Sequence, residues 1–430
     1  YSKEDVLSLP RTRADEAYLV GKGKKPVDAY LDIEDIIRIC KEHDVDAIHP
    51  GYGFLSENAQ LAKRCEEEGI IFIGPKVEHL QMFGDKVNAR IQAEKAEIPM
   101  IPGTNGAVKD FAEVKAFAER VGLPVMIKAI NGGGRGMRRV DRMEDLQGAY
   151  DEARSEAKRA FGDEDVYIEK CILNPKHIEV QIMGDEHGNV IHLNERDCSI
   201  QRRHQKVIEM APAWSLPKKL RQNICAAALK IMKNVHYVNA GTVEFLADQD
   251  EEHFYFIEVN PRVQVEHTVT EAITDVDIVK TQILVAEGYA LSDPEIGIKS
   301  QADIPCNGVA IQCRITTEDP QNNFMPDTGK INDYRSGGGP GIRLDAGTAY
   351  TGAVITPYYD SLLVKVTAHA NNAKETISRM LRCLDEFRIG GVKTNIYFLK
   401  NMLLDKNFQE GTCNVNYIDH HPELLDDPQV

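Results

Sequence analysis

The stretch that decides the fold is Glu258–His267, which reads EVNPRVQVEH. It follows the alternating apolar run Phe254–Ile257, a pattern that predicts a β-strand leaving its sheet at the step Asn260-Pro261. The stretch carries carboxylates, an amide, a guanidinium and a glutamine, and almost no apolar residue large enough to fill a core. This mixture suits a site where a divalent cation, an anion and a general base lie close together. The alternative is a polar edge strand that runs into a solvated loop.

The same stretch is the second strand of a predicted hairpin. If the acidic turn is centred on Glu251, Glu244 on the first strand lies opposite Glu258. Like charges directly across an antiparallel pair are destabilising unless something neutralises them. We therefore predict that Glu244, Glu258 and the amide of Asn260 hold a divalent metal ion, because these are the oxygen ligands that such ions prefer. The alternative is a different register, in which one glutamate faces solvent.

Bulk composition limits the class of protein. The chain has 430 residues, more than one ordinary core accommodates, which predicts two or three domains. Its composition, 42% hydrophobic and 27% charged, is that of a soluble globular protein. No apolar run approaches the roughly 20 residues that span a bilayer. The formal net charge of −16 argues against general binding of nucleic acid or anionic membranes, so a phosphate site must be a local basic pocket.

The cysteines and the chain start carry further expectations. Nine cysteines are scattered without a CxxC pair, which favours a reducing compartment over a disulfide framework or a zinc site. No secretory or transit segment is visible. The chain opens at Tyr1 without a methionine, and we expect it to be a fragment.

Four segments are predicted along the chain. Alternating strand and helix patterns at the start predict a small parallel α/β domain, and helical patterns then form a connection. A second compact unit holds a glycine-rich loop between two apolar strands, and antiparallel hairpins begin after it. The predicted boundaries are 1–75, 76–103, 104–171 and 172–430.

The last segment contains an unusually basic run. Strands His177–Met183 and Asn189–Asn194 are expected to form a hairpin, and helices are expected near Pro217–Val235 and Val276–Glu287. Between them, Glu195–Lys206 is basic in a protein that is acidic overall, which favours an anion pocket over a solvated charge run. Its basic residues are Arg196, Arg202, Arg203, His204 and Lys206.

A glycine loop and a short strand end favour a nucleotide site. The run Lys128–Met137 includes Gly132, Gly133, Gly134 and Gly136, whose backbone N–H groups could wrap phosphate oxygens, although many such loops are only flexible turns. Neither a Walker nor a Rossmann glycine pattern is present. Lys128 and Lys86 supply cations for a polyphosphate. The strand end Glu169–Ile172 suits docking of an adenine on backbone groups, or it is an interdomain linker.

Together these motifs resemble the biotin carboxylase domain of biotin-dependent carboxylases, which has the ATP-grasp fold. Within that family, the sequence is most similar to that of pyruvate carboxylases in Val259–Arg262, Glu266–Glu271, Phe324–Gly329 and Gly391–Ile396. The family resemblance covers essentially the whole chain and rests on His49–Asn58, the glycine loop, Glu195–Lys206, Glu258–His267 and Pro357–Ser361.

The resemblance implies a fold and a reaction. The fold would be α/β (α+β): an ATP-grasp with an N-terminal parallel α/β domain, a small lid domain with a glycine flap, and a larger mixed C-terminal domain. The enzyme would be an ATP-dependent ligase that carboxylates biotin with bicarbonate through carboxyphosphate, as part of the conversion of pyruvate to oxaloacetate in anaplerosis and gluconeogenesis. Its cofactors would be ATP, Mg²⁺ or Mn²⁺, and biotin on a carrier domain outside this chain.

The resemblance also assigns roles to the predicted site residues. ATP would be bound by Lys86, Lys128, Gly132, Gly133, Gly134, Gly136 and His177 at the phosphates, by Glu169, Lys170 and Ile172 around the adenine, and by Gln201 and His204 nearby. Magnesium or manganese would be held by Glu244 and Glu258 with Asn260 beside them. Bicarbonate would be placed by Lys206, Arg262, Gln264 and Val265 and deprotonated by Glu266, and Arg343 would stabilise the biotin enolate.

Partners and location follow from the same resemblance. The partners would be bicarbonate, the biotinylated carrier domain and a carboxyltransferase domain of the same polypeptide, with a dimer of this domain and a tetramer of the whole protein. No nucleic acid or membrane partner is expected. The location would be the cytoplasm in bacteria or the mitochondrial matrix in eukaryotes.

The chain departs from the family pattern in three places. The family's first strand, with an Asn-Arg-Gly-Glu motif, would precede Tyr1, so we expect the N-terminal domain to lack a strand here. The glycine flap is one glycine shorter than usual. Gly390 stands where pyruvate carboxylases commonly have arginine.

Other functions stay open at the level of sequence. The nearest is the biotin carboxylase component of an acyl-CoA (acetyl- or propionyl-CoA) or urea carboxylase. A second is an ATP-grasp ligase that acts on another carboxylate. A third is a catalytically incomplete module that only mediates interactions.

Overall fold

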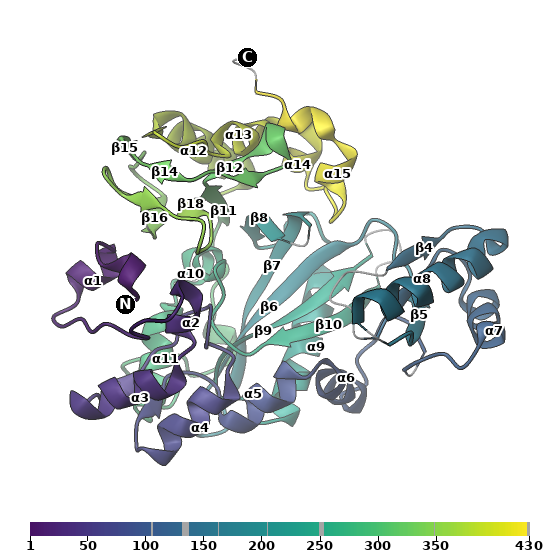
Figure 1. Ribbon diagram of the computed structural model, residues 1–430, viewed down its shortest axis with the longest axis horizontal. Coiled ribbons are helices and arrows are strands. Elements are labelled where there is room, and N and C mark those ends of the chain that lie inside the picture. Colours follow the sequence, from purple (N-terminus) through teal and green to yellow (C-terminus); the bar gives the residue numbers. More distant parts are fainter. Residues whose placement is uncertain are drawn as a thin grey trace.

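The computed structural model describes residues 1–104, 106–130, 137–161, 163–203, 205–248, 253–347 and 349–427. Its N-terminal unit contains a parallel strand pair, and Figure 1 shows the purple helices of this unit on one side of the molecule. Helices α3 and α4 begin where Asp32 and Asn58 accept hydrogen bonds from backbone N–H groups of the first helical turn. Their apolar faces meet in one small core that includes Ile37 and Leu61. The elements are α1 (Leu9–Arg13), α2 (Pro26–Tyr30), α3 (Ile33–Glu42), β1 (Ala47–Ile48), α4 (Ala59–Glu67) and β2 (Ile71–Phe72).

Two helices connect this unit to the rest of the chain. They are α5 (Val77–Gly84) and α6 (Lys86–Lys95), and Asp85 between them caps α6 by accepting from two backbone N–H groups. Phe83 and Ala89 pack into the core beneath the main sheet. Lys86, the first residue of α6, is thereby held at the rim of a large cleft.

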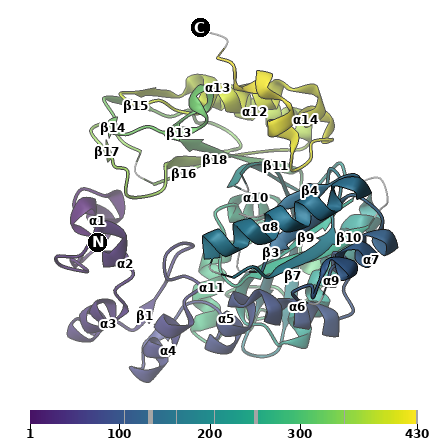
Figure 2. The ribbon, with the colours of Figure 1, turned by 45° about the vertical axis from the view of Figure 1, so that its right-hand side comes forward.

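A small three-stranded sheet stands beside the main sheet. Its strands follow the order β4-β3-β5, all antiparallel, and Figure 2 shows α8 lying across them. Alternate residues of β3 are fully buried, as a strand with one covered face requires. The elements are α7 (Phe111–Val121), β3 (Val125–Ala129), β4 (Arg138–Val140), α8 (Leu146–Phe161) and β5 (Val166–Lys170).

The main sheet has eight strands in the order β10-β9-β6-β7-β8-β11-β18-β16, and neighbouring strands are antiparallel. Helix α9 packs Ile224 and Ala228 into the core of its β6 side, and α12 packs Met380 against β11 and β18. The strands are β6 (Lys176–Gly184), β7 (Val190–Arg202), β8 (Gln205–Ala211), β9 (Asn239–Ala247), β10 (Phe254–Asn260), β11 (Val309–Thr316), β16 (Ile342–Ala346) and β18 (Leu362–Ala370).

The remaining elements surround the main sheet. The helices are α9 (Lys218–Asn234), α10 (His267–Thr274), α11 (Ile278–Ala286), α12 (Ala373–Glu386), α13 (Ile396–Leu404), α14 (Lys406–Glu410) and α15 (Tyr417–His420). The antiparallel two-stranded pairs are β12 (Glu318–Asp319) with β13 (Met325–Pro326), β14 (Gly329–Lys330) with β17 (Val354–Ile355), and β15 (Asp333–Arg335) with β19 (Arg388–Gly390). Among the helices in the described ranges, none combines the length and apolar character that crossing a bilayer requires.

Candidate active site

A cleft of about 2080 Å³ collects the predicted site residues. Residues of the N-terminal unit, the small sheet, the main sheet and the C-terminal segment all contribute to its lining. Four glycines of the flap (Gly132, Gly133, Gly134 and Gly136) and His204 lie outside the described residues. The predicted residues that line the cleft are Lys86, Lys128, Glu169, Lys170, Ile172, His177, Gln201, Lys206, Glu244, Glu258, Asn260, Arg262, Gln264, Val265, Glu266 and Arg343.

The predicted pairing of Glu244 with Glu258 is confirmed, but it depends on a β-bulge. The hairpin begins with Phe256 opposite Phe245, and that register, if continued, would place Ile257 opposite Glu244. The register shifts between Phe256 and Glu258, so that Glu258 meets Glu244 instead. The bulge therefore brings the second carboxylate to the first.

Glu244 and Glu258 fit the ligand set of a hard divalent cation. Burial raises the pKa of Glu258, and the negative charge of Glu244 raises it further. Burial works to raise the pKa of Glu244, but Lys206 and His177 together outweigh it and hold the pKa well below its usual range, so Glu244 stays ionised. The Asn260 amide donates to Glu244 at 2.9 Å, and its oxygen accepts from Arg262 at 3.2 Å. A cation between the two carboxylates would relieve their repulsion, and Asn260 would have to turn to offer its oxygen.

Lys206 contacts both a candidate metal ligand, Glu244, and the predicted base, Glu266. Its ammonium donates to Glu244 at 2.9 Å, to Glu266 at 2.6 Å and also to Glu179. Glu266 accepts a second hydrogen bond from Arg314 at 3.0 Å. Burial works to raise the pKa of Glu266, but Lys206 and Arg314 outweigh it and hold the pKa well below its usual range. Glu266 is thus ionised, and its basicity rises if one of these cations turns toward a substrate anion.

Arg196 is part of a buried frame under the site. The basic run predicted an anion pocket, and Arg196 does not contribute to one: β7 continues through it, its side chain is 0% exposed, and it is not part of the cleft lining. The guanidinium donates to Glu179 at 2.5 Å and to Gln264 at 2.8 Å. It also donates to Gln181, Thr242 and Thr270. Arg202, Arg203 and Lys206 of the same run do line the cleft.

Three of the predicted bicarbonate residues, Arg262, Gln264 and Val265, lie next to one another on the loop after β10, and the fourth, Lys206, is on β8. Arg262 donates to Glu57 of the N-terminal unit at 3.0 Å, which links that unit to the site. Gln264 donates to Glu244 at 3.0 Å. The carbonyl of Val265 accepts from Lys365 at 3.0 Å, a buried cation on β18. Arg262 and Lys365 are thus cations close to the loop that would receive an anion.

Arg343 on β16 is fixed by two carboxylates. All three guanidinium nitrogens donate hydrogen bonds: one terminal nitrogen donates to Glu271 at 2.5 Å, and Nε and the other terminal nitrogen each donate to Asp345 at 2.8 Å. Burial works to lower the pKa of Arg343, but the hydrogen bonds to Asp345 and Glu271 outweigh it and raise the pKa. The guanidinium is therefore charged and oriented, as an oxyanion partner must be.

The residues predicted to bind the nucleotide include side chains of the small sheet that line the cleft. Lys128 on β3 forms an ion pair with Glu169 on β5. The Lys170 ammonium donates to the carbonyls of Gly122 and Leu123, at 3.1 Å each. Lys86 is 86% exposed, and its ammonium lies 3.6 Å from Glu258, so it is free to turn toward a ligand.

Sequence reasoning missed several residues that hold the site. They are Glu179, Glu209, Arg314 and Lys365, which lie on the strands β6, β8, β11 and β18 and do not belong to any recognised motif. Glu209 is fully buried and accepts from Arg314 at 2.5 Å, which fixes the guanidinium that contacts Glu266. Their position could have indicated a role in the site: a charged residue inside an otherwise apolar strand is expected to be buried, and a buried charge requires a partner.

Family models match three parts of the chain. Residues 1–80 match the biotin carboxylase N-terminal domain, residues 85–294 match the ATP binding domain of the carbamoyl-phosphate synthase L chain, and residues 312–420 match the biotin carboxylase C-terminal domain. The biotin carboxylase domain of a thermophilic 2-oxoglutarate carboxylase, solved with bicarbonate, has a TM-score of 0.93 and 44% identity, covering 99% of this chain and 92% of that one. The chain therefore belongs to the biotin carboxylase family of ATP-dependent ligases, and the predicted ATP-grasp fold is confirmed.

Among the relatives are pyruvate carboxylases. That of Bacillus subtilis (strain 168) is 62% identical over 430 residues, which is 100% of this chain and 37% of that protein. The mitochondrial pyruvate carboxylase of Homo sapiens is 54% identical over 426 residues, covering 99% of this chain and 36% of that protein. The solved biotin carboxylase subunit of pyruvate carboxylase has a TM-score of 0.87 and 46% identity, covering 99% of this chain and 92% of that one. The chain thus spans little more than a third of the length of the curated relatives.

Proposed function

We propose that this chain is the biotin carboxylase part of a pyruvate carboxylase. It uses ATP and bicarbonate to carboxylate biotin on a carrier domain, and a carboxyltransferase domain then passes the carboxyl group to pyruvate to form oxaloacetate. The observation that carries the proposal is the Lys206 ammonium, which contacts both the candidate metal ligand Glu244 and the candidate base Glu266. A cation in that place can bring a metal–nucleotide and an inorganic carbon acid together.

The first step is attack of bicarbonate on the γ-phosphoryl group of ATP. Bicarbonate is a poor nucleophile, so Glu266 accepts its proton while Lys206, Arg262, Gln264 and the backbone of Val265 orient the anion. Lys206 turning onto bicarbonate leaves Glu266 with one cation fewer, which raises its pKa and its strength as a base. The products of this step are carboxyphosphate and ADP.

A magnesium or manganese ion would be held by Glu244 and Glu258, with Asn260 beside them, and it would neutralise charge on the phosphates. Lys86, Lys128 and His177 add positive or hydrogen-bonding groups on the same side of the cleft.

The second step is transfer of the carboxyl group to biotin. Carboxyphosphate breaks down to CO₂ and phosphate, phosphate accepts the N1 proton of biotin, and N1 bonds to the carbon of CO₂. Arg343, held by Glu271 and Asp345, stabilises the negative oxygen that develops on the ureido group. Arg343 and Glu266 line the same cleft, as these two consecutive steps require.

The context of the domain is part of the proposal. We place the chain in a longer polypeptide that carries the biotin carrier and carboxyltransferase domains, with this domain as a dimer and the whole protein as a tetramer. The predicted division into 1–75, 76–103, 104–171 and 172–430 stands as a proposal too. The protein would be located in the bacterial cytoplasm, or in the mitochondrial matrix of a eukaryote.

The test is ATP cleavage by the purified chain with Mg²⁺. We expect cleavage that requires bicarbonate and rises on addition of free biotin. Cleavage that is independent of bicarbonate and stimulated by another carboxylate would favour a different ATP-grasp ligase. Formation of oxaloacetate when separate carrier and transferase domains are added, tested against acyl-CoA and urea as acceptors, decides the final substrate.

A further inference from the structure

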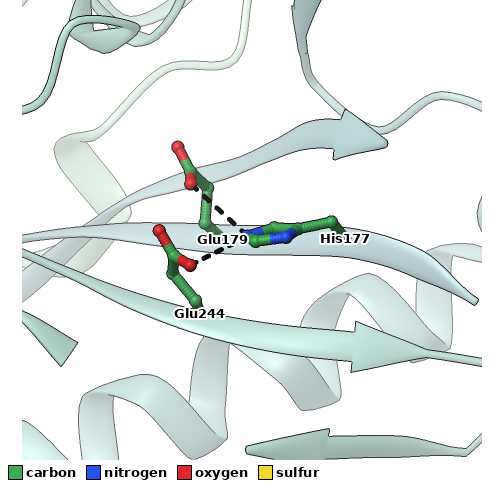
Figure 3. A group of neighbouring side chains, drawn as sticks. All are labelled: His177, Glu179 and Glu244. Carbon is green, nitrogen blue, oxygen red and sulfur yellow. Dashed lines mark ion pairs between the residues drawn. The ribbon is translucent and has the colours of Figure 1, made fainter. Parts of the chain in front are cut away.

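His177, Glu179 and Glu244 converge from two neighbouring strands (Figure 3). His177 and Glu179 are two residues apart on β6 and so project from one face of the sheet, and Glu244 on β9 is directly opposite Glu179. One ligand atom from each of the three side chains lies within 4.8 Å of the others. The strand register therefore keeps one imidazole and two carboxylates together.

The ring of His177 is aimed at both carboxylates. Its Nε2 lies 3.0 Å from the Glu244 carboxylate and 3.9 Å from that of Glu179. The contact with Glu244 is an ion pair when the ring is protonated; in the neutral ring the buried Nε2 is an acceptor that no described donor satisfies. The side-chain amide of Gln201 faces the other ring nitrogen at 3.4 Å and keeps the ring oriented. A buried imidazole nitrogen in this position is suited to binding a metal ion.

The charge at this point can be exchanged for a metal ion. The carboxylates of Glu179 and Glu244 are almost fully buried and are neutralised by the Lys206 ammonium, which donates to both. Lys206 has a flexible four-carbon side chain and also contacts Glu266 at 2.6 Å. The Lys206 ammonium can keep its hydrogen bond to Glu266 while a divalent cation replaces it as the partner of Glu179 and Glu244. Arg196 continues to neutralise Glu179 from below.

We propose that His177, Glu179 and Glu244 form a site for a divalent transition-metal ion of the Zn²⁺ class. One imidazole nitrogen and two carboxylate oxygens, with an open side toward the cleft, suit Zn²⁺ or Co²⁺ and disfavour Mg²⁺, which prefers oxygen ligands. The site shares Glu244 with the magnesium pair, so an ion in it excludes the metal of the nucleotide. Zn²⁺ would then inhibit ATP cleavage, a consequence that rests on the proposed function.

Equilibrium dialysis of the metal-free full chain against Zn²⁺ tests binding without reference to catalysis. We expect one tightly bound Zn²⁺ per chain. The variant His177→Gln should weaken binding by at least the ~10- to 100-fold that even an outer-shell substitution causes. The matched control is His420→Asn with His421→Asn, which removes the histidine pair near the C-terminal end, where Zn²⁺ could bind on the surface. Tight binding that survives His177→Gln, or that disappears in the control, overturns the proposal.

The visible spectrum of the Co²⁺-loaded chain adds a readout that needs no variant. Nitrogen and oxygen ligands give d–d bands alone, whereas the neighbouring buried group of Glu179, Cys198 and Glu266 would add a thiolate-to-metal charge-transfer band. A thiolate band overturns the assignment even if His177→Gln does not fold. Bicarbonate-dependent ATP cleavage with Mg²⁺ is measured separately: Zn²⁺ binding without cleavage refutes the proposed function alone, and cleavage without Zn²⁺ binding refutes this site alone.

Discussion

Replacing Glu266 by glutamine should separate catalysis from nucleotide binding. The amide keeps the size of the side chain and one oxygen for Lys206 or Arg314, but it cannot accept a proton at neutral pH. General base catalysis contributes ~10²- to 10⁴-fold, so bicarbonate-dependent ATP cleavage should fall by about that factor. Nucleotide affinity should change little, because the described side-chain hydrogen bonds of Glu266 are to Lys206 and Arg314 and not to the small sheet.

The structure also sets the size of the effect on stability. Lys206 keeps Glu179 and Glu244 as partners, and Arg314 keeps Glu209, so neither cation is left unpaired in the variant. One of the two hydrogen bonds from a cation becomes a bond to the neutral amide oxygen, and the other is lost because the amide NH2 group cannot accept; from typical values for such bonds this is a loss of about 2 to 4 kcal/mol in total. The free energy of unfolding should therefore decrease by about that amount, which leaves a folded protein to assay.

The assay is steady-state ATP cleavage with and without bicarbonate, together with calorimetric titration of the nucleotide. The matched variant is Glu266→Asp, which keeps the charge and withdraws the carboxylate by one methylene, and it should recover part of the activity. Equal losses of cleavage and of nucleotide affinity in Glu266→Gln would show that the residue supports the pocket as a whole. Undiminished cleavage would refute its role as the base.

Further expectations concern the buried charges around the site. Glu258→Gln in metal-free protein should raise the free energy of unfolding at neutral pH by up to ~1 kcal/mol in a urea titration, since it removes the like charge opposite Glu244; a decrease would contradict the repulsion. Burial lowers the pKa of His267 to about 4, so the unfolded chain takes up its proton first as the pH falls. Stability should then fall between pH ~6.5 and ~4 by at most about 3 kcal/mol, and an unchanged pH slope in His267→Asn would count against this. Arg196→Met should reduce the free energy of unfolding by ~3 to 5 kcal/mol, because it removes one of the two cations that hydrogen-bond to the buried Glu179, and a change below 1 kcal/mol would refute the importance of the frame.

Local patterns predicted much of the fold. The helix expected near Pro217–Val235 is α9 (Lys218–Asn234), and the one expected near Val276–Glu287 is α11 (Ile278–Ala286). Both have apolar residues at helical spacing, and Asp277 caps α11 through the N–H of Lys280. Helix α10 (His267–Thr274) was not predicted, because its β-branched residues have low helix propensity and packing of Val269 and Ile273 stabilises it instead.

The basic run around Arg196 has a structure that local sequence patterns do not predict. The strand predicted at Asn189–Asn194 continues as β7 to Arg202, through a stretch of charged residues that resembles a loop. A buried strand is normally apolar, so this continuation contradicts the usual periodicity. It is possible only because Glu179, Thr242, Gln264 and others, far away in sequence, satisfy the hydrogen bonds of the guanidinium.

The sequence by itself determined which residue types are available for metal, anion and phosphate binding: a carboxylate pair in a hairpin, a loop with Arg262, Gln264 and Glu266, and lysines that could bind phosphate. Those signals are local in the chain and need no knowledge of contacts. Tertiary structure decided the charge state of each group. The bulge before Glu258, the position of Lys206 between three carboxylates, and the buried partners Arg196 and Arg314 all depend on strands that pair across the eight-stranded sheet. Electrostatic interactions act through space and strengthen with burial, so only the folded sheet sets their balance.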